Sequence, residues 1–233
     1  MEEHPAVYIA IALVAVLVLF NQVQVNALSA AADQLTRPST RASLSGTARE
    51  LGGIDLDGLQ GTAQNLAAVF PELQGATDEQ AVMTVLFPTG TPEYTQYIGG
   101  ANFDDPINSL TYLSQWFPTI KDEVKRTDPD AWNRYLELAA KPHGLSCEYC
   151  CGVGPIAAAS NGESLCGCQH NPALLAVTLS LLHNTDYSDA QVVREVMRWK
   201  TLFFPRDMVG LGMQVAGTDP SSIKALPGMV GGC

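Results

Sequence analysis

The sequence predicts a mainly α-helical domain with one small β-hairpin flanked by cysteines, preceded by one N-terminal hydrophobic helix. Three observations lead to this fold class. Helix-start signals recur along the chain, only one segment has the pattern of a hairpin, and an uncharged apolar run stands near the N-terminus. Hydrophobic residues make up 46% of the 233 residues, which excludes a chain that is disordered throughout.

Residues 1–32 are predicted to form a retained membrane anchor. Residues 6–20 (AVYIAIALVAVLVLF) carry no charge, and an uncharged tail continues to residue 32, which together suffice for a span of ~20 residues. Two alternatives stay open: a signal peptide cleaved near residue 30, and a helix that packs with copies of itself in a homo-oligomer or filament. No basic residue precedes Arg37, so charge bias says little about topology. We expect a single-pass protein of the cell membrane with its domain on the extracytoplasmic side.

Residues 33–61 are predicted to be a linker, because they contain Pro38, several serines and threonines, and paired glycines. The helical domain then covers residues 62–233. Asx-Pro pairs and capping boxes mark where its helices begin, and prolines mark where we expect them to end. Thr77 and Ser188 are predicted capping residues, and Pro118 is a predicted stop. The predicted helices cover residues 81–87, 106–117, 129–141, 172–183 and 189–204.

The predicted hairpin lies inside a cysteine-rich module, residues 143–170. Asn161-Gly162 is the preferred pair for a tight type I′ turn, and a short segment flanks it on each side. A hairpin here returns the second group of cysteines (CGCQH) toward the first group (CEYCC), with His143 approaching the first group from the other side. We therefore expect one cluster that contains Cys147, Cys150, Cys151, Cys166, Cys168 and His170.

Three interpretations of this cluster stay open. Two short thiolate groups with a nearby imidazole are typical of zinc and iron–sulfur sites, and copper(I) also prefers thiolates. Disulfides are expected if the domain lies in an oxidising compartment. A redox-active or nucleophilic cysteine is the third, although a catalytic Cys–His pair needs a substrate cleft and no motif indicates one. The sequence assigns no reaction and favours a protein that is not an enzyme.

At these residues the sequence resembles an uncharacterised family of small microbial proteins, many of them archaeal, with one N-terminal membrane anchor. The chain departs from that family's pattern at Asn171-Pro172-Ala173, where a Ser-containing helix start is usual. The resemblance supplies no reaction. It implies that Cys233 belongs with the cysteine cluster, so that the C-terminal tail docks on the domain. The resemblance covers about residues 85–233 and is carried by SCEYCCG (146–152), NGESLCGCQH (161–170), WKTLFFP (199–205) and VGGC (230–233).

Charge narrows the function classes. The chain has 24 acidic and 13 basic residues and a net charge of −11, which excludes a protein that neutralises nucleic-acid phosphates. The sequence therefore predicts a membrane-anchored extracytoplasmic protein that binds a transition metal or metal cluster, with a structural, metal-handling or electron-transfer role. The alternative is a disulfide-stapled surface-structural or filament-forming protein assembled through its N-terminal helix. The predicted metal ligands are Cys147, Cys150, Cys151, Cys166, Cys168, His170 and Cys233.

Overall fold

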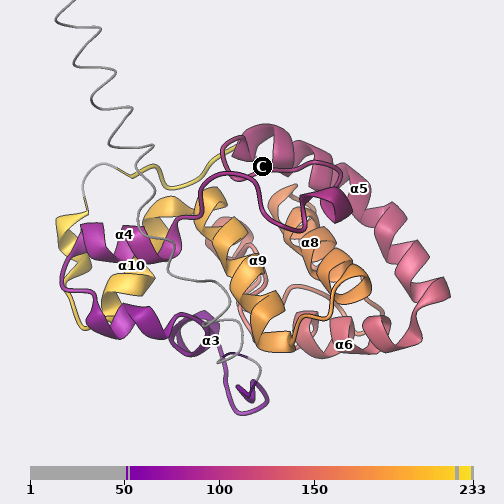
Figure 1. Cartoon of the computed structure of the whole chain (residues 1–233), viewed down its shortest axis with the longest axis horizontal. Coiled ribbons are helices and arrows are strands. Elements are labelled where there is room, and N and C mark those ends of the chain that lie inside the picture. Colours follow the sequence, from indigo (N-terminus) through magenta and orange to yellow (C-terminus); the bar gives the residue numbers. More distant parts are fainter. Residues whose placement is uncertain (1–50, 52, 224–225, 232–233) are drawn as a thin grey trace, which may run out of the picture. The chain divides into compact units, whose positions relative to one another are not determined.

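The computed structural model describes residue 51, residues 53–223 and residues 226–231, and this part of the chain is mainly helical (Figure 1). Three short 3₁₀ helices lie between the α-helices: η1 (Pro71–Gly75), η2 (Thr95–Ile98) and η3 (Pro220–Ser222). The α-helices of the described residues are α3 (Thr62–Val69), α4 (Glu79–Leu86), α5 (Pro106–Thr127), α6 (Pro129–Ala139), α7 (Glu148–Cys151), α8 (His170–Asn184), α9 (Asp189–Phe203) and α10 (Pro205–Val215).

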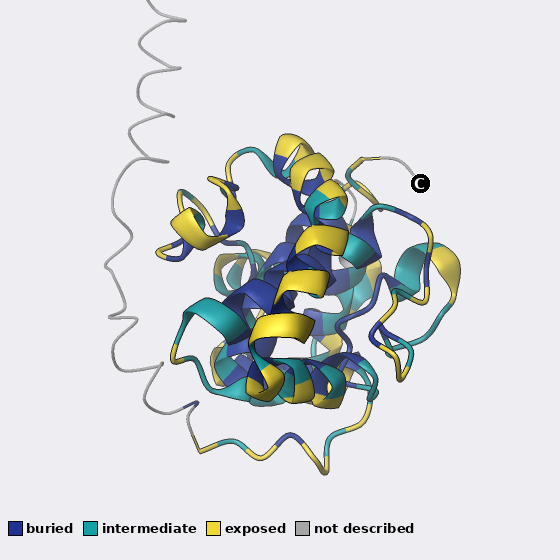
Figure 2. Cartoon of the chain, turned by 90° about the vertical axis from the view of Figure 1, so that its right-hand side faces the viewer, coloured by how far each residue is buried: buried dark blue, intermediate teal, exposed yellow. Residues whose placement is uncertain are grey.

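Helix α8 lies at the centre of the core. All its residues from Ala173 to Leu182 are buried, as expected for a helix that is apolar on every side. Helix α5 packs along α8, and α6 and α9 pack against it too, whereas α10 contacts α3, α4 and α9. Figure 2 shows the buried segments inside and the exposed turns of the outer helices facing solvent. Helix α9 therefore connects the group around α8 to the group around α10.

The predicted signals set where α5, α6 and α9 begin. Asp105, Asp128 and Ser188 each accept a hydrogen bond from a backbone N–H three residues further along, which satisfies one donor of the first helical turn. The cap at Ser188 is a complete capping box, as predicted. At α4 the prediction was wrong by one residue, because Asp78 rather than Thr77 caps the helix.

Pro118 does not end a helix, which corrects another prediction. It lies inside α5, which continues to Thr127. A proline in a helix interior removes one backbone hydrogen bond. On both sides of Pro118, however, the same face of α5 is buried in the core, through residues such as Leu113, Phe117 and Ile120. We infer that packing of this face outweighs the local cost.

The predicted β-hairpin is wrong. Within the described residues no strand forms, and the segment has a single isolated antiparallel bridge between Ala158 and Ser164. The turn at Gly162 does form, with φ 85°. The backbone N–H groups of Ala157 and Ala158, however, both donate to the carbonyl of Ala139 at 2.9 Å, at the end of α6. The two arms of the segment exchange only two backbone hydrogen bonds, from Ala159 N–H to the Glu163 carbonyl and from Leu165 N–H to the Ala157 carbonyl, and the end of α6 holds the segment as well.

The predicted N-terminal hydrophobic helix and most of the predicted linker lie outside the described residues. Among the helices that are described, none is both long and apolar enough to cross a membrane. The described residues also contain three α-helices that were not predicted, α3, α7 and α10. The tail residues 226–231 contact the core, where the N–H of Val230 donates to the carbonyl of Phe203 at 2.9 Å.

Candidate metal centre

Four cysteine sulfurs from two segments come together in the cysteine-rich module. Cys147 precedes α7, Cys151 ends it, and Cys166 and Cys168 lie just before α8. Their four Sγ atoms all lie within 4.8 Å of one another. The Sγ atom of Cys168 is 3.3 Å from that of Cys147 and 3.3 Å from that of Cys166. We call these four residues the four-cysteine group.

The redox state of this group is mixed. Cys151 and Cys166 are joined by a disulfide, whereas Cys147 and Cys168 are free thiols. Cys150 is also disulfide-bonded. Cys147 is fully buried, while Cys166 is 7% and Cys168 9% exposed. Cys151 is the exposed member of the four-cysteine group, so solvent reaches the group through this residue.

The side chain of Asn171 connects the two cysteine segments. Its Oδ1 accepts a hydrogen bond from the backbone N–H of Cys147 at 3.2 Å. Its Nδ2 donates to the carbonyl of Ala157 and to the hydroxyl of Ser164, both at 2.7 Å. The Ser164 hydroxyl in turn donates to the carbonyl of Cys166 at 2.7 Å. One buried amide thus fixes the backbone at Cys147 relative to the loop that carries Cys166.

A buried ion pair holds α7. Lys200 of α9 is fully buried, and its Nζ donates to Glu148 Oε1 at 2.6 Å and to the carbonyl of Gly144 at 2.8 Å. The hydroxyl of Thr62 donates to the same carboxylate oxygen of Glu148. Burial lowers the pKa of Lys200, while the negative charge of Glu148 opposes that shift. Because Glu148 begins α7, this pair positions the helix that presents Cys150 and Cys151.

His170 has one ring nitrogen with a partner and one without. Nε2 lies 2.8 Å from the carbonyl oxygen of Val230, so Nε2 carries the proton and donates. Nδ1 is buried and accepts no hydrogen bond. This nitrogen belongs to a ring whose metal-ligating atom lies within 4.8 Å of the sulfurs of Cys150 and Cys168. A metal-ligating histidine usually donates its other ring N–H to a carbonyl or carboxylate, as Nε2 does here to Val230.

The two free thiols share a proton unequally. A hydrogen bond from the Cys147 thiol is the main cause that lowers the pKa of Cys168, and the His170 side chain and backbone N–H groups at the start of α8 lower it further. The same contact with Cys168, together with burial, raises the pKa of Cys147. The contact between the two sulfurs therefore favours the thiolate form at Cys168 and the thiol form at Cys147.

The predicted ligands fall into two overlapping groups. The first is the four-cysteine group, and the second contains Cys150, Cys168 and His170, so Cys168 belongs to both. Cys233 lies outside the described residues. His143 belongs to neither group, contrary to expectation. It lines a separate cavity of about 130 Å³ beside acidic side chains that include Asp57 and Glu137.

Sequence reasoning missed both Asn171 as a connector and Lys200. Asn171 was interpreted as the start of a helix, and a lysine in an amphipathic helix normally faces solvent.

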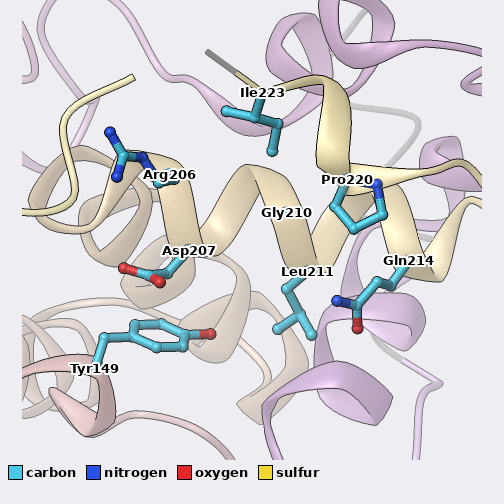
Figure 3. Close-up of a pocket in the computed structure, with 8 residues that line it drawn as sticks. All are labelled: Tyr149, Arg206, Asp207, Gly210, Leu211, Gln214, Pro220 and Ile223. Carbon is cyan, nitrogen blue, oxygen red and sulfur yellow. The ribbon is translucent and has the colours of Figure 1, made fainter. Parts of the chain in front are cut away.

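A second cavity, of about 320 Å³, is larger than the one beside His143 and lies between Tyr149 of α7 and helix α10 (Figure 3). It is lined by Tyr149, Arg206, Asp207, Gly210, Leu211, Gln214, Pro220 and Ile223, and contains none of the described cysteines.

Comparisons with protein-family models, with curated proteins and with solved structures find no match to this chain.

Proposed function

We propose that the reduced protein, with the Cys151–Cys166 disulfide opened, binds one zinc ion through the thiolates of the four-cysteine group, and that this ion has a structural role. The observation that carries the proposal is the convergence of Cys147, Cys151, Cys166 and Cys168 to within 4.8 Å. Four sulfur donors supply a complete tetrahedral set, which is the coordination that structural zinc prefers.

The distances favour a single ion over a cluster. Zinc–sulfur bonds of ~2.3 Å place the sulfurs of a tetrahedral site about 3.8 Å apart. The Sγ atom of Cys168 lies 3.3 Å from that of Cys147 and 3.3 Å from that of Cys166, which is slightly closer than the sulfurs of such a site. An iron–sulfur cluster inserts several iron and sulfide atoms between its cysteines, so its ligands need more separation.

A structural role follows from the position of the four-cysteine group. The ion would join α7 to the start of α8, the central helix of the core. The connection between them contains only one isolated bridge and would gain most from a bound ion. A structural zinc can contribute ~10 kcal/mol or more of apparent folding free energy.

Metal analysis of the full chain, purified under reducing conditions without chelator, tests this proposal. We expect one zinc per chain, no visible absorption from iron, and much weaker zinc binding in Cys147→Ser. Cys150→Ser is the matched control, since it makes the same exchange beside the four-cysteine group and should keep the zinc. His170→Ala should keep it too, because His170 belongs only to the three-residue group. A wild-type chain without stoichiometric metal would refute the proposal.

We also propose that the domain lies outside the cytoplasm, attached to a membrane through residues 1–32, whose apolar run can also serve in self-association. The disulfide of Cys150, which lies outside the four-cysteine group, supports an oxidising compartment. Fractionation of cells into soluble and membrane material, followed by protease treatment from the outer face, tests this location. Recovery of the intact chain in the soluble cytoplasmic fraction would contradict it.

A further inference from the structure

We infer that Cys151 and Cys166 alternate between binding the ion and forming a disulfide, so that a disulfide-bearing oxidant ejects the metal from the site. This inference rests on the proposed function, because it describes how the same site would be regulated. It starts from the fact that two of the four converging sulfurs are already joined, while the other two stay free.

The two states compete for the same sulfurs. A disulfide between Cys151 and Cys166 removes two of four thiolates and leaves only Cys147 and Cys168 for the ion. Two ligands do not complete the four-coordinate shell that holds structural zinc. Formation of the disulfide and retention of the ion are therefore mutually exclusive at the four-cysteine group.

Exposure selects the pair that is oxidised. Cys151 is the exposed member of the four-cysteine group, whereas Cys147 is fully buried and Cys168 is 9% exposed. An oxidant from solvent thus meets Cys151 first. Cys151 is also the last residue of α7, a helix of four residues, and Gly152 follows it with φ 67°. The disulfide therefore joins the end of this short element to the loop that precedes the core helix α8.

The reaction balances as thiol–disulfide exchange. The Cys151 thiolate attacks one sulfur of the oxidant R–S–S–R, which forms a mixed disulfide and releases one RS⁻. The Cys166 thiolate then attacks the Cys151 sulfur, forms the Cys151–Cys166 bond and releases the second RS⁻. Two cysteine thiolates are oxidised, one external disulfide is reduced, and Zn²⁺ leaves the two thiolates that remain. An external dithiol reverses both steps and restores the four ligands.

The test uses the reduced, zinc-loaded full chain with oxidised glutathione as the oxidant. Released zinc is followed with a chromogenic chelator, free thiols are counted, and the new disulfide is mapped by peptide mass spectrometry. We expect one zinc released for each Cys151–Cys166 disulfide, and rebinding of zinc after dithiothreitol is added and the chelator is removed. Cys151→Ser should bind zinc more weakly but release it at least tenfold more slowly on oxidation.

The outcomes separate the two proposals. If zinc stays bound after Cys151–Cys166 has formed, or if it leaves while Cys147–Cys168 forms instead, the redox inference fails and the zinc site stands. If the reduced wild type binds no zinc, both fail. If Cys151→Ser does not fold, the disulfide map and the zinc count of the wild type decide alone.

Discussion

Replacing the buried Lys200 by methionine should destabilise the protein strongly. The substitution keeps most of the side-chain length but removes the cation from a site with no exposure. It leaves the Glu148 carboxylate, whose side chain is 18% exposed, without its ion-pair partner, and it leaves the carbonyl of Gly144 without its donor. Removing one partner of a buried ion pair costs about 3–5 kcal/mol. We expect a loss of that size in the free energy of unfolding, measured by urea denaturation of the full chain in one metal and redox state.

A double-mutant cycle and a matched surface variant test the reasoning. If the cost arises from the stranded Glu148 carboxylate, the double variant Lys200→Met/Glu148→Gln should recover a large part of the loss. Lys141→Met makes the same exchange at an exposed pair with Glu137 and should cost far less than Lys200→Met. A loss below about 1 kcal/mol for Lys200→Met, or purely additive effects in the double variant, would refute this account of the pair.

Three further substitutions test the fold. A backbone N–H in the first turn of α6, and then the His183 side chain, lower the pKa of Asp128, so this carboxylate stabilises the fold above its unfolded pKa and loses that effect in acid. Asn can keep the cap, so Asp128→Asn should lower the unfolding free energy at neutral pH by less than about 1 kcal/mol, and a urea series should show the difference shrinking as pH falls below about 4. Pro118→Ala should raise the unfolding free energy by up to about 3 kcal/mol, because alanine restores the helical hydrogen bond inside α5 and the exposed Pro118 ring makes no core contact. An unchanged urea midpoint would contradict this. Gly162→Ala should lower the melting temperature, since φ is 85° and a Cβ would clash with the Trp132 ring; an unaltered melting curve would show that the turn adapts.

Sequence reasoning succeeded where a residue acts on its own neighbours. The caps at Asp105, Asp128 and Ser188 depend on side chains that reach backbone groups three residues away, so the local sequence contains the whole interaction. Sequence reasoning failed at Pro118 because the decisive interaction there is not local. Helix α5 is long and packs along α8, and the sequence around Pro118 does not contain that packing.

Lys200, at the candidate metal centre, is a second residue whose role the local sequence does not contain. It follows Trp199 on an amphipathic helix, where a lysine is expected at the edge of the buried face. What keeps it fully buried is Glu148, which lies 52 positions earlier and whose Oε1 accepts from Lys200 Nζ at 2.6 Å. Burial of a cation requires a partner that only the folded chain supplies. No pattern around Lys200 could therefore have marked it as part of the site.

The convergence of the cysteines could be predicted, but their pairing could not. Six cysteines allow fifteen complete pairings, and the spacing along the chain does not select among them.

The error in the predicted start of α8 explains why Asn171 was missed as the connector of the two cysteine segments. Asn171 was expected to lie before the helix and to cap it, but α8 already begins at His170. The Asn171 side chain is thus free to bind the backbone at Cys147 and at Ala157. In the same helical turn, the His170 ring donates from Nε2 to the carbonyl of Val230, and its Nδ1 is buried. A shift of two residues in one helix boundary therefore converts a capping residue into the connector of the two cysteine segments.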